Sequence, residues 1–368
     1  MDDFKRSRAG EHFTAPATPD NRQPGRSPRK KSPVYAFSED NAVLTLFSRF
    51  PRDKNLEGLN SVRVPELADV AASVTTLVIE GSDVTEAQVY GIKSIRDDLL
   101  TGLSRVSLPD FTGEIPKDAF AKTPFFNINA WLEYFSAPLA SGVGKNAFRR
   151  CERLATVDIS SATTIRYNAF YYCTALINIH LPAAETIGYN AFGYCTALTN
   201  VSLPVAETIW YNAFCYCTAL INVHLPVAET IEENAFGYCS ALTNVSLPVA
   251  ETIGYNAFCY CTTLTNVHLP VAKTIKYEAF CNCPALTDVY LPAARIIETY
   301  AFSDCGKISV LKLGCPGVIT LETSMFGEDE DSVASKVDLY LHPSRIPSSG
   351  TAYGGYTWKS ISPYVPEP

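Results

Sequence analysis

The sequence predicts an α/β solenoid, in which short coils stack into one elongated body. We expect a parallel β-sheet on one face of the stack and short helical or 3₁₀ turns on the opposite face. The prediction rests on a 22-residue pattern that recurs eight times, with a strand signal and then a turn signal in each unit. A unit this short cannot bury its own apolar side, so a strict period indicates stacked coils that share one core.

Three columns of apolar residues mark the repeat. The first is a phenylalanine that follows alanine, at Phe148, Phe170, Phe192, Phe214, Phe236, Phe258, Phe280 and Phe302. Three residues later comes a cysteine, at Cys151, Cys173, Cys195, Cys217, Cys239, Cys261, Cys283 and Cys305. Three further on is an aliphatic residue, at Leu154, Leu176, Leu198, Leu220, Leu242, Leu264, Leu286 and Ile308. These columns are the expected core.

Each unit can be divided into its elements in chain order. Apolar residues alternate around Val245 and Leu247, as in a half-buried strand, and the proline that follows ends the strand because it has no N–H to donate. Ile253 is expected to return the chain to the core. Asn256 then suits the N-cap of one short helical or 3₁₀ turn, with Phe258 facing inward. Parallel strands about 4.8 Å apart would give eight coils a length of roughly 40 Å.

The order Leu-x-x-Val-x-Leu-Pro, then Ile, then Ala-Phe-x-x-Cys-x-x-Leu resembles the BspA-like class of leucine-rich repeats. The resemblance is close between Lys145 and Leu313, with weaker copies on either side. The ending from Tyr353 to Ser362, which contains Trp358, is similar to the aromatic tail that often closes such arrays. The resemblance implies a leucine-rich repeat solenoid, and a cell-surface or secreted protein that binds host or neighbouring-cell macromolecules.

Four segments follow from the repeat boundaries. Residues 1–40 hold five prolines and a basic cluster from Arg22 to Lys31, and we expect a disordered leader there. Residues 41–144 are expected to form an N-terminal cap with degenerate repeats. Residues 145–313 carry the regular repeats, and residues 314–368 form a degenerate last repeat with a C-terminal cap.

Charge and hydropathy restrict the class of partner and the location. Eight of the 30 basic and six of the 38 acidic residues lie in the first 40, so the remainder has a formal charge of −10. An acidic body argues against nucleic acid as the main ligand. No apolar run has the length of a transmembrane segment. The residues after Met1 are charged and show no secretory signal, so the cell surface is expected on resemblance alone, and the cytoplasm is the alternative.

The twelve cysteines are expected to be mainly core residues. Eight lie in one column next to the core phenylalanines, where a buried, reduced thiol acts as a small hydrophobic side chain. Cys215, Cys259 and Cys281 occupy a second column, which we expect to face outward. Cys259 and Cys281 are on adjacent coils and could pair in an oxidising compartment. The Cys-x-Cys spacing is not that of a structural zinc site.

The outward positions of the strands form the candidate binding surface. One column is Asn178, Asn200, Asn222, Asn244, Asn266 and Asp288, and the other is His180, Ser202, His224, Ser246, His268 and Tyr290. Histidine and serine alternate, which indicates a 44-residue double unit. Consecutive histidines would be roughly 10 Å apart, too far to share a zinc ion whose ligands lie about 2 Å from the metal. The asparagines could hydrogen-bond along the stack, a role compatible with ligand contact.

Two other surfaces carry regular columns of polar or aromatic residues. Glu185, Glu207, Glu229 and Glu251 form an acidic column, followed by Lys273 and Arg295. Tyrosines form two columns, Tyr167, Tyr189, Tyr211, Tyr255 and Tyr277, and then Tyr172, Tyr194, Tyr216, Tyr238 and Tyr260. Tyrosine suits recognition, although covering the turns between coils is an equally simple role. Solvent and salt can relieve the acidic column without a bound cation.

The sequence contains none of the common catalytic or nucleotide-binding motifs, such as Gly-x-Ser-x-Gly or a phosphate-binding Gly-Lys-Ser/Thr loop. We therefore expect a binding module without enzymatic activity, metal or cofactor, whose partner is a protein or glycan. An intracellular protein-interaction scaffold is the alternative.

Overall fold

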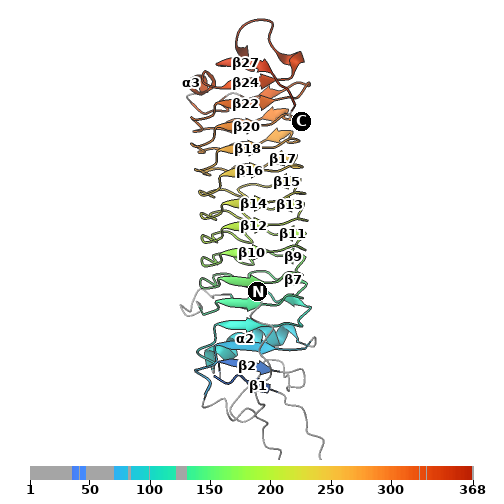
Figure 1. Ribbon diagram of the computed structural model, residues 1–368, viewed down its shortest axis with the longest axis vertical. Coiled ribbons are helices and arrows are strands. Elements are labelled where there is room, and N and C mark those ends of the chain that lie inside the picture. Colours follow the sequence, from blue (N-terminus) through green and yellow to red (C-terminus); the bar gives the residue numbers. More distant parts are fainter. Residues whose placement is uncertain are drawn as a thin grey trace, which may run out of the picture.

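The computed structural model describes residues 35–40, 42–46, 70–81, 84–98, 100–121, 131–322, 324–328 and 330–366. These residues form one straight column of stacked coils, with β1 at one end and β27 at the other (Figure 1). Most of the expected leader, residues 1–34, lies outside the described residues. Within the segment expected to be the leader, Tyr35–Phe37 form the first strand, β1.

The expected main sheet runs along one side of the column in two parts. The first part contains β1 (Tyr35–Phe37), β2 (Val43–Leu46), β3 (Thr76–Ile79), β4 (Arg105–Ser107), β6 (Tyr134–Ser136), β8 (Thr156–Asp158), β10 (Asn178–His180), β12 (Asn200–Ser202) and β14 (Asn222–His224). The second contains β16 (Asn244–Ser246), β18 (Asn266–His268), β20 (Asp288–Tyr290), β22 (Val310–Leu313), β24 (Asp338–Leu341) and β27 (Ser360–Pro363). All neighbours are parallel except β1 and β2, which are antiparallel.

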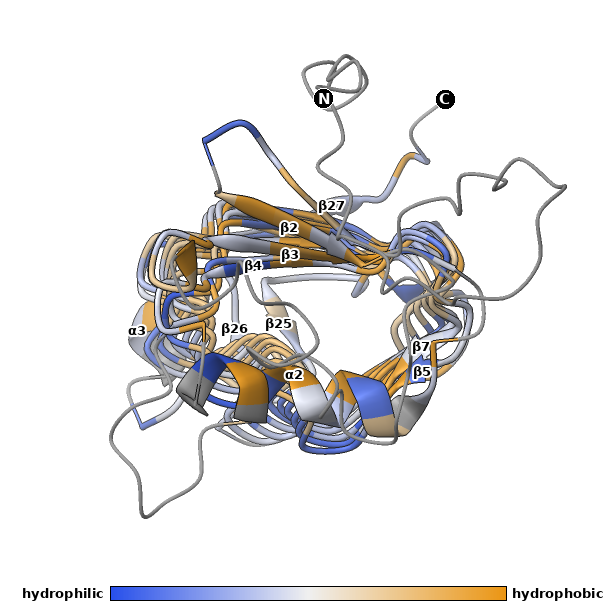
Figure 2. Cartoon of the chain, turned by 90° about the horizontal axis from the view of Figure 1, so that it is seen from below, coloured by the Kyte–Doolittle hydropathy of each residue, from blue (hydrophilic) through white to orange (hydrophobic). Residues whose placement is uncertain are grey.

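A second parallel sheet, which the sequence did not predict, lies on an adjacent side of each coil (Figure 2). It consists of two-residue strands, β5 (Glu114–Ile115), β7 (Gly142–Val143), β9 (Thr164–Ile165), β11 (Thr186–Ile187), β13 (Thr208–Ile209), β15 (Thr230–Ile231), β17 (Thr252–Ile253), β19 (Thr274–Ile275), β21 (Ile296–Ile297) and β23 (Thr320–Leu321). In the six Thr-Ile strands, from β9 to β19, the isoleucine turns inward, as expected, and the threonine is exposed or half-buried. The return segment is therefore a strand and not a simple crossing.

The helical or 3₁₀ turns expected opposite the main sheet do not form in the repeats. The residues that flank Ala-Phe adopt a left-handed conformation, with φ of 55° at Asn168 and 62° at Tyr172, and this interrupts any helix. Alternate N–H groups donate to the next coil instead, as when Phe170 donates to the carbonyl oxygen of Ala191 at 2.8 Å. Asn256, proposed as an N-cap, is one of these left-handed residues.

The core is built from the predicted columns. Rings of the Phe column stack from coil to coil, with centroids 5.0–5.5 Å apart between Phe148 and Phe302. Each column cysteine donates its thiol hydrogen to the phenylalanine carbonyl of the preceding coil, as Cys195 does to Phe170 at 3.2 Å. The same carbonyl accepts the N–H of Cys173 at 3.1 Å. The thiols thus complete the hydrogen bonding of a buried backbone.

Near its two ends the column departs from the regular repeat. At the first end, α2 (Glu86–Asp98) lies on the side opposite the main sheet (Figure 2). At the other end, Trp358 is buried and packs against Phe326 and Tyr356, with ring centroids 6.0 and 5.7 Å away. The C-terminal segment also contains α3 (Glu330–Ala334), the 3₁₀ helix η2 (Pro343–Arg345), and the hairpin of β25 (Ala352–Tyr353) with β26 (Tyr356–Thr357). The predicted aromatic tail covers the last coil.

Replacement of Phe236 by alanine should lower the free energy of unfolding by about 3–5 kcal/mol. The side chain is fully buried and stacks on Phe214 and Phe258, so its loss opens a cavity that two neighbouring coils share. Denaturant melts of the variant and the parent protein measure the difference.

Tyr255→Ala in the adjacent coil is the matched control, because that side chain is 43% exposed. Its effect should stay within about 1 kcal/mol, as for most surface substitutions. A loss below about 1 kcal/mol for Phe236→Ala would contradict the stacked core.

Candidate functional site

The twelve predicted residues form two in-register columns on the outer side of the main sheet, which we call the Asn/His face. They are Asn178, His180, Asn200, Ser202, Asn222, His224, Asn244, Ser246, Asn266, His268, Asp288 and Tyr290. Strand pairing aligns Asn178 with Asn200 and Asn244 with Asn266, while the residue between the two outward positions turns inward. All twelve are exposed except Ser202 and Tyr290, which are half-buried. The coil architecture thus brings residues 22 apart in sequence together on one surface.

The asparagine column forms a ladder of amide hydrogen bonds. The Nδ2 of Asn222 donates to Oδ1 of Asn200 at 2.9 Å, and Asn266 donates to Asn244 at 2.9 Å. A longer bond of 3.4 Å joins Asn200 to Asn178. Threonine hydroxyls assist, since Asn266 also donates to Oγ1 of Thr265 at 3.0 Å. The predicted ladder therefore fixes the orientation of the amides on the face.

The face is divided at one position that the sequence does not reveal. No strand pairing joins β14 to β16, although both are fully described, and the amide ladder stops between Asn222 and Asn244. Val223 is half-buried, whereas the equivalent Val201 and Val245 are 2% and 1% exposed. The second sheet continues past this point through β13, β15 and β17. The Asn/His face is thus two adjoining blocks on one column.

The histidine column ends in an aromatic contact. His268 stacks on Tyr290 with ring centroids 4.4 Å apart, and the hydroxyl of Tyr290 is 2.8 Å from that of Tyr364 in the C-terminal tail. Lys312 lies over the other side of the ring, 5.6 Å from its centroid. Tyr290 is therefore already held by the fold. In the part of the chain that the structure describes, no cluster of three or more His, Cys, Asp or Glu side chains could hold a metal.

The turn side of the coils carries a tyrosine ladder, Tyr172, Tyr194, Tyr216, Tyr238 and Tyr260. Neighbouring rings are nearly parallel, with centroids 4.2–4.6 Å apart. Burial first, and then the neighbouring tyrosines, raise the pKa of Tyr194 to about 12. The stacked rings fit the expected role of covering the turns between coils.

The other tyrosine column is more exposed and less regular. Tyr189, Tyr211 and Tyr255 are 46%, 37% and 43% exposed, and Trp210 packs against Tyr189. The acidic column on the second-sheet side is also exposed, and it ends where Lys273 pairs with Glu251 at 2.6 Å. These two columns remain accessible surfaces beside the Asn/His face.

The second cysteine column differs from expectation. Cys215, Cys259 and Cys281 were expected to face outward, but they are only 7%, 4% and 3% exposed, because they pack beneath the turns. Cys259 and Cys281 form a disulfide between adjacent coils, with Cα atoms 4.6 Å apart. Cys215 has glycine at the same position in both neighbouring coils, so no cysteine is in register with it.

The column cysteines are free and buried, as predicted. Burial raises the pKa of the Cys151 and Cys195 thiols to about 12, and that of Cys239 well above its ordinary value. Since the thiolate is the reactive form, these cysteines are poor nucleophiles at neutral pH.

Comparison with known proteins gives one family match and several structural likenesses. The model of the BspA type leucine-rich repeat region, in six copies, matches residues 113–240 and 229–331, which together are more than half of the chain. No curated protein shows significant sequence similarity. None of the helices in the described parts has the length and apolar character needed to cross a bilayer.

Three solved structures illustrate the structural likenesses. An internalin from Listeria monocytogenes has a TM-score of 0.38 at 14% identity, covering 80% of this chain and 81% of that one. A leucine rich cell surface protein from Faecalibacterium prausnitzii gives 0.35 at 17% identity, over 93% and 96%. The pneumococcal vaccine antigen PcpA gives 0.35 at 14% identity, over 72% and 80%.

Alkylation should distinguish the buried thiols from accessible ones. In the native protein at pH 8, iodoacetamide should label the column cysteines only slowly, because they are protonated and covered, and should label them fully after denaturation. Mass spectrometry should also recover Cys259 and Cys281 in one disulfide-linked peptide from protein purified without reductant. Rapid native labelling of Cys239 would contradict its place in the core.

Proposed function

Because this chain belongs to the BspA-type leucine-rich repeat family, we propose that it is a non-enzymatic binding module, on the cell surface or secreted, whose Asn/His face recognises an extended protein or glycan. Solenoids commonly use such extended surfaces for recognition. The observation that carries the proposal is the repetition of the same exposed polar groups on successive coils, from Asn178 to His268.

The amide ladder supports this use of the face. The amide of Asn222 donates one hydrogen along the stack and retains a second donor, whereas Asn200 and Asn266 use both hydrogens, on an asparagine and on a threonine hydroxyl. Each of these side chains is already held by the neighbouring coil, which lowers the entropy lost when a ligand binds. Within each block, a partner with a repeated backbone would meet an amide group at every coil, about 4.8 Å apart. Many weak contacts would then add up along the column.

The disulfide supports a location outside the cytoplasm. Structural disulfides persist in oxidising compartments and are rare in the cytosol. Cys259 and Cys281 are adjacent, buried and bonded, as expected of a protein exposed to such a compartment. The acidic charge of residues 41–368 supports a protein or glycan partner over nucleic acid.

An intracellular interaction scaffold is the second candidate. The observation in its favour is the set of ten free cysteines, all buried, which suits a reducing environment equally well. The Asn/His face could bind a partner either inside or outside the cell.

Combined replacement of Asn222, His224, Asn266 and His268 by alanine should abolish partner binding and leave the thermal melt nearly unchanged. These side chains are exposed, so their loss removes contacts without opening a cavity. Binding of the parent and variant proteins to immobilised collagen and to insoluble polysaccharides measures the effect.

Tyr211→Ala with Tyr255→Ala is the matched control on the more exposed tyrosine column. It should retain binding. Binding that survives the four-residue change but is lost in the tyrosine variant would transfer the site to the turn side.

Protease treatment of intact native cells should degrade the protein if it is displayed outside. The cytosolic marker proteins should survive the same treatment. Protection from external protease, together with a soluble cytosolic pool, would support the scaffold instead.

A further inference from the structure

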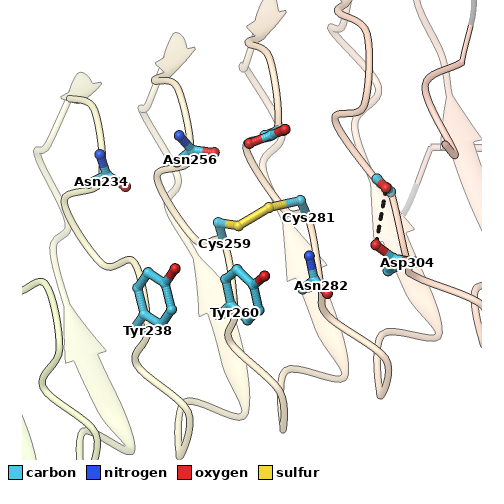
Figure 3. A pocket seen from close by; sticks show the side chains of 10 residues that line it. Asn234, Tyr238, Asn256, Cys259, Tyr260, Cys281, Asn282 and Asp304 are labelled. Carbon is cyan, nitrogen blue, oxygen red and sulfur yellow. Dashed lines mark hydrogen bonds between the residues drawn. A yellow bond between two sulfur atoms is a disulfide. The ribbon is translucent and has the colours of Figure 1, made fainter.

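A hollow of about 250 Å³ lies on the turn side, where the tyrosine ladder ends (Figure 3). Its walls are two columns, with Asn234 and Asn256 on one side and Tyr238 and Tyr260 on the other. The buried Cys259–Cys281 disulfide lies between the two walls. Because the Asn/His face belongs to the main sheet, this hollow is a separate surface of the coil.

The hollow exists because the ladder column changes residue type. After Tyr260 the same position is occupied by Asn282 and then by Asp304, which are too short to continue the stack. Tyr260 is 39% exposed, whereas the four tyrosines before it are half-buried. The last ring therefore has no aromatic neighbour on its outer side.

The first ring of the ladder shows what can cover such a position. In the coil before Tyr172, the same column holds Arg150, and its guanidinium carbon lies 5.2 Å from the centroid of the Tyr172 ring. The chain thus places its own cation over one end of the ladder. At the other end, the corresponding position is held by Asn282, whose side chain is shorter than the Tyr260 ring and carries no charge.

The groups around the hollow are acidic or hydrogen-bond acceptors. Glu278 continues the asparagine wall and Asp304 continues the tyrosine wall, so two carboxylates line the hollow. Neither takes part in an ion pair with any residue that the structure describes. Asp304 accepts a bond from Ser303 at 3.3 Å, and Lys276 is over the Tyr255 ring at 5.1 Å.

The aromatic ring of Tyr260 and the two carboxylates together fit a planar cation. A guanidinium can lie on a ring while its fork of N–H groups donates to carboxylates. An ammonium is a compact point charge without the planar fork. We infer that this hollow binds the guanidinium of an arginine side chain presented by a partner protein.

Titration with the peptide acetyl-Gly-Arg-Gly-amide tests the inference on the full chain. With ring-labelled tyrosine, the NMR signal of Tyr260, assigned from Tyr260→Phe, should shift and saturate, while that of Tyr194 should not move. In the control peptides, citrulline has nearly the shape of arginine but no charge, and lysine has a charge but no planar guanidinium group. Both should bind at least tenfold more weakly.

Glu278→Gln combined with Asp304→Asn should lower the affinity for the arginine peptide at least tenfold and leave the thermal melt unchanged. Glu207→Gln with Glu229→Gln removes the same charge from the exposed acidic column and should leave the affinity within twofold. Equal binding of the citrulline or lysine peptide would overturn the inference. So would a loss in the control variant as large as in the hollow variant, or shifts spread over all tyrosines.

Discussion

The structure depends on one constraint, that in the regular repeats each residue lies over the residue 22 positions earlier. Backbone N–H groups meet this constraint by donating to the next coil, even in the turns, as Phe170 does to Ala191. Side chains then stack on their own kind, which places phenylalanine on phenylalanine, tyrosine on tyrosine and amide on amide. The core, the amide ladder and the hollow all follow from this register.

The same register explains why much of the fold could be predicted. A strict period fixes which residues are neighbours, so the columns of phenylalanine, cysteine and asparagine could be assigned from spacing alone. The second sheet was missed because Thr164–Ile165 and its equivalents are two residues long, too short to show the alternation that marks a strand. The turn was misassigned because Phe, Cys and Leu at i, i+3 and i+6 also suit a helical turn. Asn168 can adopt a left-handed conformation readily, but Tyr172 gives no such signal.

The division of the Asn/His face could not be predicted from the sequence, whereas the hollow could. The division between β14 and β16 has no sequence signal, since Asn-Val-His and Asn-Val-Ser also occur in strands that pair normally. The hollow did have a signal, because Asn282 and Asp304 interrupt the tyrosine column. The burial of the disulfide between the walls of the hollow was not predicted, since Cys259 and Cys281 were expected to face outward. Whether a residue at the edge of a turn is covered depends on the left-handed backbone there.

The alternation of glycine and cysteine beneath the turns bears on how such an array can change length. Cys215 lies between Gly193 and Gly237 and has no cysteine in register. Gain or loss of two coils at a time would keep this pattern. Loss of the single coil that holds Gly237 would place Cys215 next to Cys259, at the spacing where Cys259 and Cys281 are bonded. Three cysteines would then compete for one bond. The pairing pattern thus favours recombination in units of 44 residues, the same double unit that alternates histidine with serine on the outer face.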